Sequence, residues 1–225
     1  MFFGLSMVIA FFARGSVLAT LLPSAALRRF LAGGCFGTVG ALITISPLGR
    51  ISGAHINPAV SFAFRLEAKL AWRDTLGYVL AQSLGAVLGA WPLLVWGATG
   101  RSVQYGASTV GAGVSTRVAL AGEVLATGAL VLAIFITAAH ARTRQFTPWT
   151  LPPLFARLVW WQGPWSGAST NPARSLGPAL LTGQWSQFWI YVLGPPLGAA
   201  LAIAVLRYEV LGQHRVQVAR LFHFS

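Results

Sequence analysis

The chain has 225 residues, of which 56% are hydrophobic and only 9% are charged, and its mean hydropathy is +0.68. A soluble domain carries about 25% charged residues, so this composition excludes a water-soluble globular protein and indicates a membrane protein. The net charge of +12 comes from short basic clusters between apolar runs. Such clusters are typical of membrane-protein loops and argue against nucleic acid as a partner.

The N-terminal residues 1–23 form an apolar run that lacks a basic n-region and is interrupted by Arg14. A first transmembrane helix is therefore a better interpretation than a cleaved signal peptide. Five further segments approach the about 20 apolar residues that a bilayer core requires. The six expected spans are residues 2–22, 30–48, 75–98, 117–139, 148–162 and 186–208. The fifth span is short and contains two prolines and Arg157.

Nothing in the chain indicates a cofactor or an enzyme. Cys35 is the single cysteine, so no intrachain disulfide is possible, and the four histidines are scattered without metal-ligand spacing. The four acidic residues lie apart, and no set of nucleophile, base and acid converges. We expect no cofactor and no catalytic residues.

The chain repeats itself. SGAHINPAVS at 52–61 matches SGASTNPARS at 166–175 in seven of ten positions, and YVLAQSLGAVLGA at 78–90 matches YVLGPPLGAALAI at 191–203 in seven of thirteen. Each repeat has two spans, a short half-segment and a third span, so the second repeat must lie inverted in the membrane. Inverted repeats place a shared site near the bilayer midplane. We expect one all-α membrane domain over 1–225, with repeats at about 1–98 and 116–208 and a cytoplasmic tail at 209–225.

Loop charge predicts the orientation. With the N-terminus inside, nine basic residues lie on the inner side and four on the outer side, which favours both termini on the cytoplasmic side. We expect the membrane to be the plasma (inner) membrane. The inner set is Arg50, Arg65, Lys69, Arg73, Arg142, Arg144, Arg207, Arg215 and Arg220, and the outer set is Arg28, Arg29, Arg101 and Arg117.

Two Asn-Pro pairs interrupt the apolar chain, at Asn57 and at Asn171. Asn is a good helix cap and Pro is tolerated at the first helical position, so each pair predicts the start of a half-helix of about 10 residues. In an inverted pair the half-helices meet tip to tip. The amides then face a passing solute, and the positive helix ends oppose cations. The alternative is that each pair merely starts a surface helix.

The segments ISGAHINPAVSFAF and SGASTNPARSLGPAL resemble the aquaporin (major intrinsic protein) family, in particular its bacterial or plant NIP-like branch. The resemblance implies six transmembrane helices, two re-entrant half-helices and a passive channel for water or small uncharged solutes such as glycerol. It also implies a homotetramer in the lipid bilayer with one pore per subunit. A secondary transporter with inverted repeats is the runner-up, although the chain offers it no pair of coupled acidic residues.

The resemblance assigns residues to the pore. Its paired motifs fall on Asn57, Pro58, Ala59, Asn171, Pro172 and Ala173. Its selectivity filter falls on Arg174, Ala168, Val159 and either Phe36 or Gly37, and its support of the pore loops falls on His55 and Glu123. Gating by pH at His55, or a proton relay at Glu123, is the alternative role for each of the last two.

Two departures from the family pattern bear on function. The family's helix-one glutamate is missing, which leads us to expect a truncated N-terminus. The segment before Trp165 lacks the small residues that let membrane helices pack closely, and it carries Arg157. A distorted fifth helix and a non-conducting, degenerate copy are therefore a third interpretation.

Overall fold

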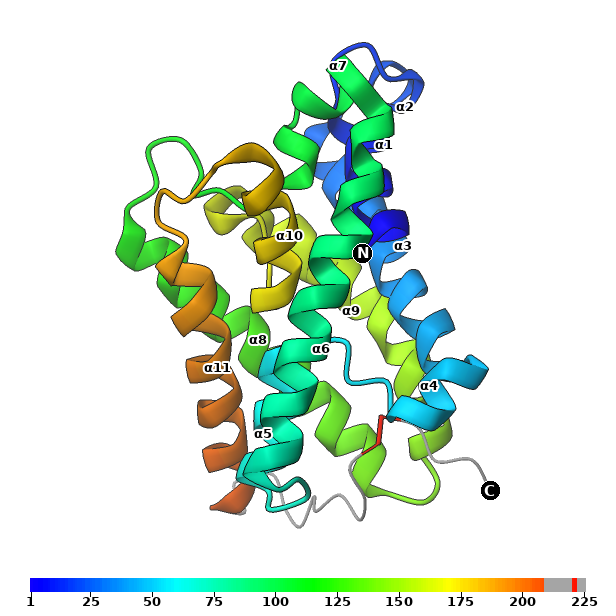
Figure 1. Cartoon of the computed structure of the whole chain (residues 1–225), viewed down its shortest axis with the longest axis vertical. Coiled ribbons are helices and arrows are strands. Elements are labelled where there is room, and N and C mark those ends of the chain that lie inside the picture. The colour runs from blue at the N-terminus through cyan, green and yellow to red at the C-terminus, as the bar shows by residue number, and fades with distance from the viewer. Residues whose placement is uncertain (209–219, 222–225) are drawn as a thin grey trace.

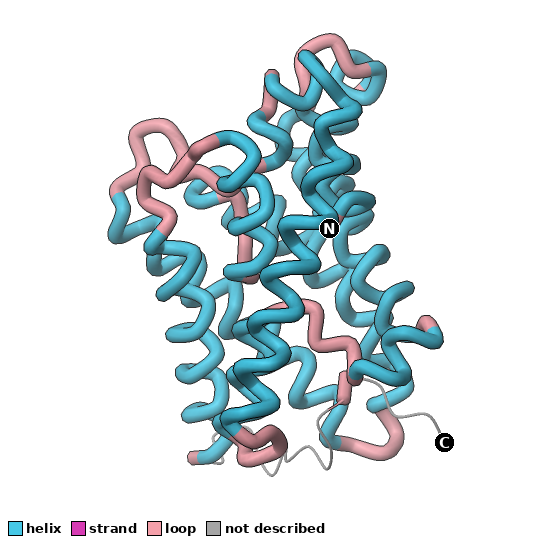
Figure 2. The backbone as a smooth tube through the Cα atoms, in the orientation of Figure 1, coloured by secondary structure: helices cyan, strands magenta, loops and turns pink. Residues whose placement is uncertain are grey.

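A computed structural model describes residues 1–208 and 220–221, and the described residues form helices and loops with no strand. Figure 1 shows the helices as a bundle, and Figure 2 shows two loop segments that run through its interior. In chain order the elements are α1 Phe2–Phe12, α2 Val17–Leu21, α3 Ala25–Ile45, α4 Pro47–Ser52, α5 Pro58–Leu66, α6 Trp72–Ala90, η1 Trp91–Trp96, α7 Gly97–Arg101, η2 Gln104–Gly106, α8 Thr116–Ala139, η3 Arg144–Phe146, α9 Thr147–Ser166, α10 Pro172–Thr182 and α11 Trp189–Arg207.

These elements follow the expected inverted order. The first repeat comprises α1, α3, the half-helix α5 and α6, and the second comprises α8, α9, the half-helix α10 and α11. In Figure 1, α5 lies in the lower half of the molecule and α10 in the upper half. The end that carries α2 and α7 is called the upper end below, and the end that carries α4 is called the lower end. Most of the expected tail at 209–225 lies outside the described residues.

The first helix is shorter than the sequence predicts. It ends at Phe12 instead of continuing to residue 22, because the backbone turns through Gly15 at φ 77° and Ser16 caps a separate short helix by accepting from the Ala19 N–H. Eleven residues are too few to cross a bilayer core. Among the described residues, four helical stretches are long and apolar enough to cross one: 25–45, 72–101, 116–139 and 189–207.

Helix α9 is continuous over 20 residues, although it contains Pro152, Pro153 and Pro164. The small residues in the contact between α9 and α3 lie on α3 instead of α9. A Cβ on Gly33 would collide with the Phe155 carbonyl, and one on Gly37 would lie 2.5 Å from the Leu151 carbonyl oxygen. Glycines of α3 therefore let the two backbones approach closely. We expected small residues on α9, and the structure places them on α3.

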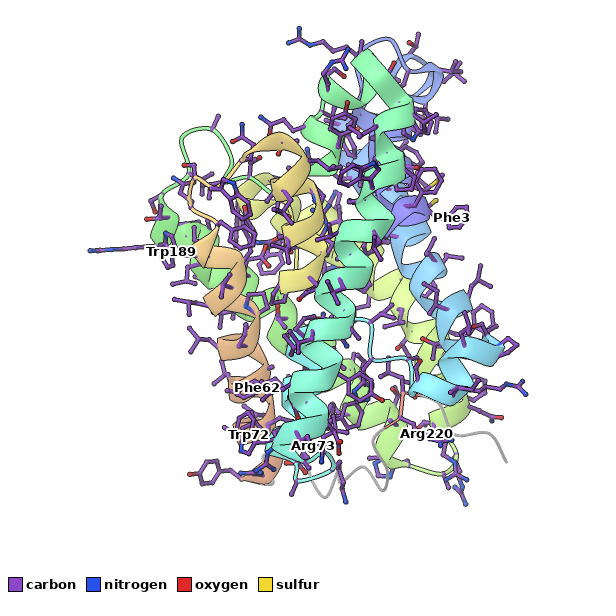
Figure 3. All side chains as sticks on the ribbon, in the orientation of Figure 1. Phe3, Phe62, Trp72, Arg73, Trp189 and Arg220 are labelled. Carbon is purple, nitrogen blue, oxygen red and sulfur yellow. The ribbon has the colours of Figure 1, made fainter. Side chains whose placement is uncertain are left out.

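The outward faces of the helices are apolar. Leu76, Leu80, Leu84 and Leu88 recur every four residues along α6, and each is more than half exposed. Such a stripe suits contact with lipid. Figure 3 shows Trp72 near the lower end of the bundle and Trp189 at the upper end of α11, and both side chains are about half exposed. Tryptophan is favoured at the membrane–water interface.

Candidate pore

The two half-helices start at the asparagines and meet in the interior. The Asn57 Nδ2 donates to the Thr170 carbonyl at 2.8 Å, and the Asn171 Nδ2 donates to the Ile56 carbonyl at 2.9 Å. Each amide oxygen caps its own helix, accepting from the Ala59 N–H at 2.9 Å or the Arg174 N–H at 3.1 Å. The sequence predicted caps at these positions, but not the reciprocal bonds between the loops.

The loops before the asparagines share an unusual backbone. Gly53 and Ala54 have φ of 71° and 59°, and their repeat counterparts Gly167 and Ala168 have 82° and 50°. A left-handed alanine is strained and persists only where neighbouring contacts hold it. The two loops therefore have similar φ angles at corresponding positions of the two repeats.

Glu123 of α8 holds the second loop. Its Oε1 accepts from the Ser169 N–H at 2.9 Å and from the Ser166 Oγ at 2.5 Å, and its Oε2 accepts from the Thr170 N–H at 2.7 Å. The carboxylate is fully buried. Gln162 adds to this network by donating to the Ser166 Oγ at 2.5 Å. The left-handed loop backbone thus has its N–H groups satisfied by one side chain from another helix.

The first loop is held differently. The Gln82 Nε2 donates to the His55 carbonyl, and it lies 3.0 Å from the Ser61 Oγ. The His55 ring stacks on Phe64 with centroids 4.4 Å apart and lies 4.9 Å from the Tyr78 ring. His55 is buried and does not line either of the cavities described next.

Two cavities lie on either side of Arg174, and the lower one adjoins the asparagines. The lower cavity, of about 140 Å³, is lined by both asparagines and by apolar side chains such as Val60, Leu130 and Ile134. The upper cavity, of about 300 Å³, is lined by Val159 and Ala168, among others. Phe36, Phe155 and Arg174 line both cavities, so they stand at the junction.

Arg174 is positioned by the loop between η2 and α8. Its Nη1 donates to the Gly106 carbonyl at 2.8 Å and to the Ser108 Oγ at 2.6 Å. The same Ser108 hydroxyl accepts from the Ser175 Oγ at 2.8 Å. Only 7% of Arg174 is exposed, and its guanidinium is fixed at the junction by two partners within the protein, the Gly106 carbonyl and the Ser108 hydroxyl.

The structure separates the two alternatives on α3. Phe36 lines both cavities, whereas Gly37 faces the backbone of Leu151 and Pro152 and lines neither. The assignment of Gly37 to the pore wall is therefore wrong. Consecutive positions on a helix face directions about 100° apart, so Gly37 faces α9 when Phe36 faces the cavities.

A family comparison now decides the class of protein. The model of the family described as "Major intrinsic protein" matches residues 2–208. The chain belongs to the major intrinsic protein family. Members of this family form membrane channels for water and small solutes, and this chain is an integral membrane channel protein of that kind.

Curated members of the major intrinsic protein family are similar to the chain over most of its length. The lens fiber major intrinsic protein of Gallus gallus is 34% identical over 92% of this chain and 82% of its own length. Aquaporin NIP1-1 of Zea mays is 38% identical over 70% of this chain, and Aquaporin-4 of Mus musculus is 37% identical over 77%. The chain spans only about half the length of these two relatives, 55% and 54% respectively.

A solved structure shares the fold. The aquaglyceroporin from Plasmodium falciparum superposes with a TM-score of 0.76 at 21% sequence identity, and the match covers 93% of this chain and 90% of that chain. This likeness supports the all-α membrane architecture of the major intrinsic protein family.

Several residues at this major intrinsic protein site carry no signal in the sequence. Gly106 and Ser108, which hold Arg174, lie in a segment without a motif, and Gln162 lies at the end of the irregular fifth span. Gln82 and Ser166 were within reach, because each belongs to a matched segment of the repeats. The described residues contain no group of three or more His, Cys, Asp or Glu side chains that could hold a metal ion.

Proposed function

We propose that solute passes from the upper cavity, between Phe36 and Arg174, into the lower cavity and past Asn57 and Asn171. The observation that carries this proposal is that Arg174 lines both cavities while both asparagines line the lower one. The two cavities and the meeting point of the half-helices therefore follow one another along a single path through the repeat interface.

The junction suits small uncharged solutes. One part of its wall is the Arg174 guanidinium, which donates hydrogen bonds to a solute oxygen. The rest of the wall is apolar, from Phe36, Phe155, Val159 and Ala168, and none of the histidines that the structure describes lines it. The hydroxyls of a polyol such as glycerol can accept hydrogen bonds from Arg174, and its C–H groups can contact the apolar wall. We propose that the filter consists of Arg174, Phe36, Val159 and Ala168 and admits glycerol as well as water.

The same path opposes cations. The N-terminal ends of α5 and α10 point toward the meeting loops, and each carries a partial positive charge of about half a unit. Arg174 adds a full positive charge above them. Glu123 is buried behind the second loop and bound to its backbone, and it lines neither cavity.

The setting in the cell follows from the charges at the two ends. The lower end carries Arg65 at the end of α5, Lys69 in the loop that follows and Arg73 at the start of α6, together with Arg142 and Arg144 after α8. We place this end in the cytoplasm of the plasma (inner) membrane, with both termini on that side. The chain acts as one channel domain over 1–225 in a homotetramer, without cofactor and without enzymatic chemistry.

No described contact favours the competing functions. A coupled transporter requires an ion site, and Glu123, the one described carboxylate at this depth, is engaged by loop N–H groups and Ser166. A non-conducting copy is the outcome that experiment must exclude. We expect proteoliposomes that contain the chain to shrink faster than empty ones under separate osmotic and glycerol gradients in stopped-flow light scattering. Permeability equal to that of empty liposomes would overturn the channel, and a requirement for an ion gradient would favour the transporter.

A further inference from the structure

Arg28 and Arg29 are adjacent at the upper end of α3, but their surroundings differ. The Arg28 Nη1 donates to the Leu22 carbonyl at 2.6 Å and to the Ala19 and Pro23 carbonyls at 3.3 Å. Arg28 therefore closes the C-terminal end of α2 and has a structural role. Arg29 makes no hydrogen bond or ion pair within residues 1–208 and 220–221, and its Nε is buried without a partner.

Arg29 lines the upper cavity together with Arg174. Arg29, Gly33 and Phe36 recur at intervals of four and three residues, so they share the face of α3 that lines the pore. The stem of Arg29 crosses Gly163 of α9, where an added Cβ would lie 3.3 Å from the Arg29 Cδ. This glycine leaves room for the arginine above the filter.

No carboxylate of the described residues lines this cavity. Within the described part of the chain, Glu67 and Asp74 lie near the lower end, where Glu67 pairs with Arg207 at 3.1 Å. Glu123 faces the opposite side of the second loop and is fully buried. Among the described residues, the lining of the upper cavity therefore holds two guanidinium groups and no carboxylate, and the half-buried Arg29 has its Nε without a partner.

We infer that the upper cavity binds a small planar oxyanion, such as nitrate or a short carboxylate, between Arg29 and Arg174. A guanidinium presents its donors as a planar fork that matches two oxygens of such an anion. Its volume of about 300 Å³ has room for such an anion with some water. This inference rests on the proposed function in one respect, because the bound anion lies on the proposed solute path.

The lower cavity prevents the anion from continuing. Below Phe36 the walls are mainly aliphatic, from Val39, Val60, Leu130, Ile134 and Leu151, so an anion that moves down leaves the Arg29 guanidinium and exchanges its hydration for apolar surface. The bound oxyanion therefore stays above the filter and obstructs the passage of neutral solutes. The site is one for binding and block, not for anion transport.

The experiment measures binding first, independently of conduction. Purified protein in detergent is titrated with sodium nitrate by calorimetry, with sodium chloride at equal ionic strength as the reference. We expect saturable nitrate binding that Arg29→Gln weakens by about tenfold or more. Arg29→Lys, which keeps the charge but not the fork, should weaken nitrate binding to an intermediate degree. Arg117→Gln, which removes an exposed arginine at the upper end outside the cavity, is the matched control and should bind as the unmodified chain does.

A second measurement follows glycerol efflux from proteoliposomes with nitrate or chloride present. Nitrate should slow efflux through the unmodified chain and through Arg117→Gln, and Arg29→Gln should need about tenfold more nitrate for the same block. Absence of saturable nitrate binding, equal binding of chloride, or equal binding by Arg29→Gln would overturn the inference. Nitrate binding by a chain that conducts neither water nor glycerol would support the site and contradict the proposed function instead.

Discussion

The side chain of Asn57 donates a 2.8 Å hydrogen bond to the backbone carbonyl of Thr170, 113 positions further along the chain. Asn171 returns the same bond to Ile56 at 2.9 Å. Each asparagine therefore caps its own half-helix and ties it to the loop of the other repeat. The asparagines are structural ties between the repeats as well as candidate donors to solute.

Replacing Asn57 should separate these roles from ordinary capping. Asn57→Ala loses the cap of α5, at about 1 kcal/mol, and a buried bond that leaves the Thr170 carbonyl unpaired, at about 1–3 kcal/mol. Ser115→Ala is the control, because Ser115 caps α8 at its exposed end by accepting from the Val118 N–H. Unfolding by SDS from mixed micelles should show the larger loss of stability for Asn57→Ala. Equal losses would contradict the tie between the repeats.

Replacing Glu123 should loosen the second loop. Gln at this position keeps one oxygen acceptor and presents an NH₂ group to a loop N–H, so Glu123→Gln should cost about 1–3 kcal/mol. Glu67→Gln is the control, because Glu67 makes an ion pair near the lower end of the bundle. Stability in the same SDS titration, together with glycerol permeability, checks the prediction. A proton relay at Glu123 would instead predict intact stability with a loss of proton movement.

Removing the Arg174 charge should weaken the barrier to cations. Arg174→Val leaves the junction apolar and removes a fixed positive charge, so proteoliposomes should leak protons while water permeability stays at or above its original value. A pH-sensitive dye inside the vesicles measures the leak. Arg117→Gln removes an exposed arginine and should not leak. If vesicles that contain Arg174→Val did not leak protons, the barrier to cations would be assigned to the half-helix ends alone.

Phe36 and Gly37 should respond to substitution in different ways. Phe36→Ala removes an aromatic wall at the junction and should raise the permeability ratio of glycerol to water. Gly37→Ala instead drives a methyl group against the Leu151 carbonyl and should reduce stability by about 1–3 kcal/mol. Phe30→Ala, on the exposed face of α3, is the control for loss of an aromatic ring. An unchanged ratio in Phe36→Ala would remove Phe36 from the filter.

Leu221 should restrict the lower cavity. Its side chain is buried, it lines this cavity, and its N–H donates to the Gly53 carbonyl at 3.2 Å. Leu221→Ala widens the cavity beside the first loop, so glycerol permeability should rise. Leu201→Ala, which shortens a half-exposed leucine on α11, should leave permeability as it was. A permeability of Leu221→Ala equal to that of the unmodified chain would contradict this role.

The sequence alone was sufficient for the architecture. Apolar runs with few charges predict spans, and Asn-Pro predicts a capped helix start, because both are local consequences of solvation and backbone geometry. The matched motifs at Asn57 and Asn171 then require an inverted pair, since each repeat has three spans. The two half-helices followed from these local patterns, and the resemblance of the two motif segments indicated the family.

Contacts between distant segments depended on the tertiary structure. The choice between Phe36 and Gly37 turns on helix rotation, which a one-residue ambiguity in spacing leaves open and the close contact with Leu151 settles. The early end of α1 at Phe12 likewise reflects a turn at Gly15 inside an otherwise apolar run. Folding brings loop and helix surfaces together across tens of residues, and this decides the partners of Arg174 and leaves Arg29 without a polar partner among the described residues. No local pattern in the sequence encodes which polar groups then meet.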